Sequence, residues 1–305
     1  MSALLSLGQT ALELGLICSL TVLALFLSYS MLNVCDLSTD GCFTLGAAVG
    51  AVVAISGHPY LSIIAAMLAG IASGFITAFL QTRMGIDSLL AGIIVNTALY
   101  SVNIGIMGGS SLLNMNKTET VFTKMKLFLG DSNLSKYYIL IVTIIAVILV
   151  LVFLIYFLNT KLGLAIRATG NNADMVKSSS INPVFTTTVG LCVANAFTGL
   201  SGCLLAQSQK FVDINIGQGM VTIALASLLI GRTVMGKGSV GKRAVGVVLG
   251  AFIFRLVYTI ALRFNMPAFM LKFVSSVIVV IAISWPYLKS QAPMLQRRLS
   301  HRKEG

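Results

Sequence analysis

The sequence predicts an all-α membrane protein, a polytopic bundle of about nine or ten transmembrane helices. The chain has 305 residues, of which 57% are hydrophobic and only 10% are charged, whereas soluble domains carry about 25% charged residues. Apolar segments long enough to cross about 30 Å of hydrocarbon recur from residue 14 to residue 288. Basic residues lie mainly in the gaps between them. We expect one transmembrane domain over residues 1–288 and a basic tail over residues 289–305.

A window of about 19 residues selects the candidate spans. In chain order they cover about 14–33, 41–57, 60–81, 88–108, 138–158, 183–209, 219–235, 241–262 and 268–288. The second is short and glycine-rich, and the seventh has Arg232 inside its end, so these two are the weakest. An additional half-span near residues 34–45 or 105–130 would raise the number to ten.

The distribution of Lys and Arg predicts the orientation. If the C-terminus is cytoplasmic, the inside gaps and tail hold 13 basic residues and the outside gaps hold 6. Cytoplasmic loops carry the excess of basic residues, so the tail is expected inside and, with nine spans, the N-terminus outside. The first segment lacks a basic leader and is too long for a signal-peptide core, so we expect it to be retained as a span.

Composition also excludes several classes of function. The net charge is +12, but the basic residues lie in the gaps between the apolar segments and in the tail, as in membrane proteins. No stripe of basic residues alternates with aromatic residues, which argues against nucleic-acid binding. The five cysteines are odd in number and lack metal-ligand spacing, so they are interpreted as packing residues. No catalytic or metal-binding cluster is evident, and we expect no cofactor. Glycines four apart, as in Gly46/Gly50, Gly70/Gly74 and Gly246/Gly250, are expected to let helices pack closely.

A polar run precedes the second span. Asp36 and Asp40 stand between apolar segments, where carboxylates are costly unless they face water, pair or cap a helix. Ser38, Thr39 and Asp40 suit an N-cap, so the second span is expected to start here with its positive end at a polar point. Transporters build sites at membrane depth from such helix ends. The run is therefore either the lining of a cavity or an ordinary turn.

The fourth span carries a polar stripe. Asn96, Tyr100 and Asn103 follow i, i+4, i+7 spacing and share one helix face, and Asn195 lies within the sixth span. Such residues either line a solute path or join helices through hydrogen bonds.

The connection over residues 162–183 predicts a short surface helix. Gly170 is expected to break the chain direction, Asn171 or Asn172 to cap a helix over 173–180, and Pro183 to start the next span. Met175 and Val176 would then be available to a partner. The alternative is a plain amphipathic connector.

A glycine-rich turn over residues 231–241 nearly matches a nucleotide-binding loop. Gly231, Gly236 and Lys237 are in place, but Gly238 stands where Ser or Thr must hold Mg²⁺, and the preceding segment is an apolar span instead of a strand. We therefore expect no ATPase activity in this chain, which is not expected to be an enzyme.

Together these elements resemble the permease family of ribose-type and branched-chain amino-acid-type ABC importers, over roughly residues 14–288. The matching positions are 33–41 with Gly46-Ala47; Leu162-Gly163, Ala168, Gly170, Asn172 and Ile181-Asn182; and Leu229 through Gly246. The chain departs from the pattern at Asp40, Asp174-Met175, Ser179-Ser180 and Arg232. Its Leu37–Gly41 form looks most like a branch associated with tryptophan/tyrosine-type amino-acid uptake.

The resemblance implies the type II importer permease fold, in a bacterial cell membrane, and transport by alternating access. The implied partners are ATP-binding-cassette ATPase subunits, an extracytoplasmic solute-binding protein and a second permease copy. Residues 109–137, with Lys210 and Asp213, would face the binding protein. The ATPase-coupling helix would comprise Arg167, Gly170, Asn171, Asn172, Asp174, Met175 and Lys177. The translocation path would comprise Asp36, Ser38, Asp40, Asn96, Tyr100, Asn103 and Asn195.

Two other functions stay open at this point. A secondary transporter or channel would transport solute without an ATPase, and a structural membrane protein would not need the coupling helix. The substrate is not readable from the chain, because the resemblance implies that a separate binding protein supplies most of the selectivity.

Overall fold

The computed structural model describes residues 2–130, 133–236 and 238–263, together with isolated residues between 273 and 284. The elements over the first half are α1 (Ser2–Leu25), which continues as the π-helix η1 (Phe26–Met31), α2 (Thr39–Ile55), α3 (Pro59–Thr82), α4 (Ser88–Ile106), β1 (Leu112–Asn114), α5 (Val121–Leu129) and η2 (Asn133–Tyr137). The second half contains α6 (Tyr138–Asn159), α7 (Lys161–Asn171), α8 (Ala173–Ser178), α9 (Pro183–Gln209), β2 (Phe211–Asp213), α10 (Met220–Met235) and α11 (Val240–Arg263).

The structure is a polytopic helical bundle, as expected. Six described helices are long and apolar enough to cross a membrane, and α2 and α10 are shorter apolar helices. These eight correspond to the first eight predicted spans. The ninth, 268–288, lies outside the described residues apart from isolated helical positions. Around residues 34–45 and 105–130, the described chain holds the start of α2, strand β1 and the nine-residue α5, so neither region adds a span.

The first helix starts earlier than predicted. It begins at Ser2 instead of near residue 14. In this early part of the helix, Gln9 Nε2 donates to Glu13 Oε1 one turn later at 2.8 Å. Such i, i+4 pairs stabilise a helix where hydropathy alone gives no signal.

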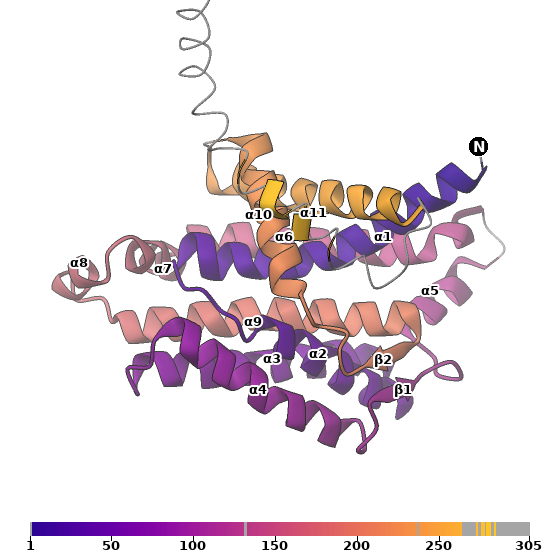
Figure 1. Ribbon diagram of the computed structural model, residues 1–305, viewed down its shortest axis with the longest axis horizontal. Coiled ribbons are helices and arrows are strands. Elements are labelled where there is room, and N and C mark those ends of the chain that lie inside the picture. Colours follow the sequence, from indigo (N-terminus) through magenta and orange to yellow (C-terminus); the bar gives the residue numbers. More distant parts are fainter. Residues whose placement is uncertain are drawn as a thin grey trace, which may run out of the picture.

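The central helix of the bundle is α9. It packs most extensively against α3 and α2 on one side, and against α1 on the other. The helices α10 and α11 pack together beside α1, while α4 lies outside α2 and α3 (Figure 1). Most of α9 is buried, whereas α6 is both the most apolar and the least buried of the six long helices, as expected of a helix that faces lipid.

Glycines permit the contacts of α9. A Cβ at Gly46 would overlap the carbonyl of Gly199, and one at Gly70 would overlap the carbonyl of Asn195. A Cβ at Gly250 would likewise overlap the Ser227 carbonyl across the α10–α11 contact. The predicted packing role of these glycines is confirmed, because only a residue without a side chain allows backbones to come so close.

The two ends of the bundle differ. The short helices α7 and α8 lie at one end, and α5, β1 and β2 lie at the other, where α1 also begins (Figure 1). Strands β1 and β2 pair antiparallel, with Leu113 opposite Val212. This pairing joins the connection between α4 and α6 to the connection between α9 and α10. The described parts of segment 109–137 therefore lie at the same end as Lys210 and Asp213 (Figure 1), and their role as a binding-protein face stays a prediction.

Candidate functional site

A polar pocket lies between α2, α4 and the segment that precedes α10. Its volume is about 370 Å³. Four residues of the predicted path line it: Asp40, Asn96, Tyr100 and Asn103. The structure therefore brings the stripe on α4 together with one of the two carboxylates before the second span.

Six further residues line this pocket and were not predicted: Gly41, Thr44, Thr97, Ser101, Ile214 and Gln218. Thr97 and Ser101 directly follow Asn96 and Tyr100 and widen the same helix face, so helical spacing could have identified them. Gln218 belongs to an irregular segment, for which the sequence carries no periodic signal.

Asp40 holds the start of α10. Its Oδ2 accepts a hydrogen bond from the Gly219 backbone N–H at 2.9 Å, and its Oδ1 accepts one from the Val221 N–H at 2.8 Å. The carboxylate lies in the first turn of α2 but caps a different helix. A carboxylate suits this position because the first N–H groups of a helix have no intrahelical partner and carry a partial positive charge. The N-terminal ends of two short helices thus meet at this residue.

The α4 stripe is divided between packing and the pocket. Asn103 is buried and its Nδ2 donates to the Gly41 carbonyl at 3.2 Å, which joins α4 to α2. A Cβ at Gly41 would lie 2.7 Å from Asn96 Oδ1, so glycine is needed beneath that side chain. Tyr100 is 48% exposed and opens the pocket to the surroundings.

The other three residues of the predicted path, Asp36, Ser38 and Asn195, form a buried polar cluster. Asp36 Oδ1 accepts from the Ser38 backbone N–H at 2.9 Å and from Ser38 Oγ at 2.6 Å. Asp36 Oδ2 accepts from Asn195 Nδ2 at 2.8 Å. These side chains are at most 1% exposed and do not line the polar pocket. The cluster fixes the chain before α2 to the middle of α9; a role in the path itself stays a prediction.

The start of α2 lies where it was expected, at Thr39, after the N-cap residue Ser38. The Ser38 side chain makes no capping hydrogen bond to α2, because it is engaged by Asp36. Thr77 of α3 donates to the same hydroxyl at 3.2 Å.

The connection after α6 forms two helices. Asn172 caps α8, since its Oδ1 accepts from the backbone N–H groups of Asp174 at 3.1 Å and Met175 at 3.0 Å. Asp174 and Lys177 form an exposed ion pair at 3.1 Å. Asn171 is exposed, and Arg167 is half-buried on α7. The predicted capped surface helix therefore exists, over Ala173–Ser178 instead of 173–180.

Two details of this segment were predicted wrongly. Gly170 does not break the chain; it lies inside α7, where a Cβ would overlap the Met31 carbonyl at the end of η1. Met175 is 66% exposed, but Val176 is 3% exposed and faces the bundle. Consecutive helical residues point about 100° apart, so on α8 Val176 is turned toward the bundle while Met175 faces outward.

Buried contacts join α7 to the rest of the bundle. Ile166 is fully buried, and the hydroxyls of Thr169 and Thr186 lie 2.8 Å apart across the α7–α9 contact. Since Gly170 packs on residues 31 and 32, α7 touches the segment that leads directly to Asp36.

The glycine-rich turn has the wrong context for a nucleotide site. Gly231 is inside α10 and Gly236 ends that helix with φ +62°, so no strand precedes the turn. Within the described residues, no group of three or more His, Cys, Asp or Glu side chains could hold a metal ion. All five cysteines are free.

Comparison with known proteins extends these observations. Residues 9–283 match the family model described as the permease component of the branched-chain amino acid transport system. The chain is 31% identical to a tyrosine transport system permease protein of Clostridioides difficile (strain R20291), over 87% of this chain and 86% of the relative. It is also 31% identical to an uncharacterized protein of Rickettsia prowazekii (strain Madrid E), over 90% of this chain and 96% of the relative. A fructose import permease protein of Bifidobacterium longum (strain NCC 2705) is 24% identical, over 82% and 72%. No solved structure matches the chain.

Proposed function

The chain belongs to the family of permease components of branched-chain amino acid transport systems, and from this premise we propose that it is the membrane subunit of an amino-acid importer driven by separate ATPases. An aromatic amino acid is the first solute to test, because one relative is named a tyrosine transport permease. The chain itself is not an enzyme; ATP hydrolysis takes place in ATP-binding-cassette subunits.

The proposed orientation places α8 and the C-terminus in the cytoplasm. The excess of basic residues predicts this side for the connection that contains α7 and α8. The paired strands β1 and β2, with α5, then face an extracytoplasmic binding protein at the opposite end (Figure 1).

The exposed helix α8 is the observation that carries the proposal. Met175 projects from it at 66% exposure, and the helix is held in shape by the Asn172 cap. We assign it the docking contact with an ATPase subunit, as a helix seated in a groove through an apolar anchor. A helix serving merely as a connector would not need such an anchor.

A continuous set of contacts leads from α8 into the membrane. The helix that precedes α8 in the chain, α7, packs through Gly170 on residues 31 and 32. A few residues further on, Asp36 is hydrogen-bonded to Asn195 at the middle of α9. If an ATPase subunit displaced α8, the movement would thus be transmitted to α9 through packed residues instead of a flexible loop.

The polar pocket is the proposed part of the solute path in one subunit. Tyr100, Thr97 and Ser101 on α4 are exposed beside it, so one side of the pocket is open. We assign that open side to a second copy of the chain, with the path running between the two copies. Asp36, Ser38 and Asn195 would then support the path from behind.

The test is co-purification and transport with the candidate ATPase. We expect Met175→Lys to reduce ATPase binding and uptake at least about tenfold, because a charge replaces the apolar anchor. Val234→Lys is the matched control: Val234 is 56% exposed at the end of α10, which joins α11 at the cytoplasmic side in the proposed orientation, and lies outside the proposed contact.

Two results would contradict the proposal. Undiminished uptake by vesicles that hold this chain without any ATPase would favour a secondary transporter or channel. Equal ATPase binding by Met175→Lys and the wild type would remove α8 from the docking contact.

A further inference from the structure

An apolar groove of about 430 Å³ lies between α3 and α6, with α9 as its floor. All its lining residues are apolar: Ile63, Met67, Val121, Val142, Ile145, Ala146, Leu149, Val150, Phe153, Phe197, Leu200 and Leu204. On the α6 wall, Ile145, Leu149 and Phe153 are 47%, 65% and 48% exposed. The groove therefore opens sideways, toward the lipid that surrounds a multi-pass membrane protein.

The dimensions suit one hydrocarbon chain. Along α6 the groove runs from Val142 to Phe153, which is about 16 Å at 1.5 Å per residue. One leaflet of the bilayer core is about 15 Å thick. The groove is thus long enough for an acyl chain in one leaflet.

Two lysines of α5 lie above the two walls. Lys124 Nζ is 5.5 Å from the ring centroid of Tyr60, and Tyr60 stands one turn before Ile63 on α3. Lys126 Nζ is 5.8 Å from the ring centroid of Tyr138, which stands one turn before Val142 on α6. Aromatic rings and lysines at this level are typical of the membrane–water interface. The groove therefore has a cationic mouth above an apolar interior.

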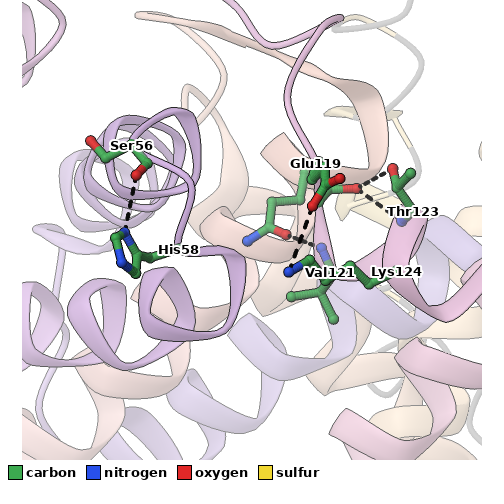
Figure 2. Close-up of polar contacts among 8 residues, drawn as sticks. Ser56, His58, Glu119, Val121, Thr123 and Lys124 are labelled. Carbon is green, nitrogen blue, oxygen red and sulfur yellow. Dashed lines mark hydrogen bonds and ion pairs between the residues drawn. The ribbon is translucent and has the colours of Figure 1, made fainter.

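The position of α5 is fixed by a buried polar contact. The Val121 backbone N–H donates to Gln207 Oε1 at 2.9 Å, and Gln207 Nε2 donates to Ser62 Oγ at 2.7 Å (Figure 2 shows the contact at Val121). Lys124 also pairs with Glu119 at 3.6 Å (Figure 2). Lys126 is exposed, and the segment from Met115 to Tyr137 contains four lysines against two carboxylates. The local charge at the mouth thus favours an anion.

We propose that this groove is a binding site for an anionic phospholipid, with one acyl chain between α3 and α6 and the phosphate at Lys126 and Lys124. The apolar lining contributes affinity for any acyl chain, and the lysines contribute the preference for a negatively charged headgroup. The site lies apart from the polar pocket, so lipid binding and solute transport are separable.

The headgroup is tested by native mass spectrometry of the full chain, titrated with phosphatidylglycerol or phosphatidylcholine of identical acyl chains. We expect phosphatidylglycerol to bind at least about fivefold more tightly, since each lysine near the phosphate contributes about this factor. Lys126→Glu should abolish the preference. Lys117→Glu makes the same charge change at an exposed lysine of the same connection that lies outside α5, and should preserve the preference. Equal binding of the two lipids by the wild type, or an unchanged preference in Lys126→Glu, would overturn the proposal.

The groove itself is tested by filling it. Ala146→Phe should reduce binding of phosphatidylglycerol at least about tenfold, and Ile145→Trp, at a half-exposed position that tolerates size, serves as a second variant if the first is unstable. Ala72→Phe enlarges an exposed alanine of α3 that does not line the groove, and should bind as the wild type does. Wild-type lipid binding in a well-folded groove-filled variant would refute the site.

A second copy of the chain is the competing occupant. A cysteine introduced by Leu149→Cys would form a disulfide between copies in native membranes if that were so. We expect no such product, and its appearance in good yield would overturn the lipid assignment.

Discussion

Loss of the hydrogen bond between Asp36 and Asn195 is expected to destabilise the protein by several kcal/mol. Both side chains are 1% exposed, and the bond of 2.8 Å joins groups 159 residues apart. A hydrogen bond to a charged group contributes about 1.5–3 kcal/mol. Asn195→Ala removes this donor and leaves the buried carboxylate with only its two bonds from Ser38, so the free energy of unfolding should fall by about 2–4 kcal/mol.

A double-mutant cycle measures the coupling between Asp36 and Asn195. The free energy of unfolding would be measured by SDS titration of the full chain in mixed micelles for Asn195→Ala, Asp36→Ala and the double variant. We expect the double variant to be less destabilised than the sum of the two single variants by about 1.5–3 kcal/mol, because both substitutions remove the same bond. Asn159→Ala, at an exposed asparagine that bonds only within its own helix, should stay within about 0.5 kcal/mol of the wild type.

Additivity within about 0.5 kcal/mol would refute the cluster as a stabilising unit. A loss of less than about 0.5 kcal/mol in Asn195→Ala would do the same, since it would mean that the carboxylate finds another donor.

Three further predictions concern the cap of α10, the close contact at Gly46 and the cap of α8. Asp40→Ala should lower the free energy of unfolding by about 1–2 kcal/mol in the SDS titration, through loss of the α10 cap, and Asp40→Asn should restore much of it; equal losses would contradict the capping role. Gly46→Val should prevent close packing on Gly199 and abolish folded, monodisperse protein in size-exclusion chromatography, whereas Gly105→Ala, which meets nothing within 4 Å, should be tolerated. Asn172→Ala should weaken ATPase binding about fivefold by loosening α8, with recovery in Asn172→Asp, and an unaffected affinity would argue against a preformed docking helix.

The transmembrane helices could be predicted from hydropathy, because bilayer thickness fixes the length of each apolar segment. The pocket on α4 could be predicted in part for a similar reason, since the period of a helix places Asn96, Tyr100 and Asn103 on one face. Local helix starts could also be predicted from the sequence. Asn172 caps α8 and Pro183 is the first residue of α9, positions that asparagine and proline favour.

Long-range partners could not be predicted. The sequence suggests Asp40 as a cap for its own helix. In the structure its carboxylate accepts hydrogen bonds from the backbone N–H groups of Gly219 and Val221, about 180 residues later in the chain. The sequence suggests that Asp36 lines a water-filled cavity. In the structure it is buried and accepts hydrogen bonds from Ser38 and from Asn195 of α9. The burial of Val176 depends on how α8 meets the bundle. Each of these depends on which helices are neighbours in space, and a single sequence does not specify that.

The glycine contacts of α9 restrict how the protein can change shape. Because backbone meets backbone at Gly46 and Gly199, and at Gly70 and Asn195, any sliding of α9 along α2 or α3 would drive side chains into carbonyl groups. We therefore expect α2, α3 and α9 to move as one rigid body. By contrast, α4 contacts α2 and α3 less extensively than these two helices contact α9, and the start of α10 is held to α2 by two backbone hydrogen bonds to the Asp40 carboxylate. We expect small rearrangements to be easier at these two places than between α2, α3 and α9.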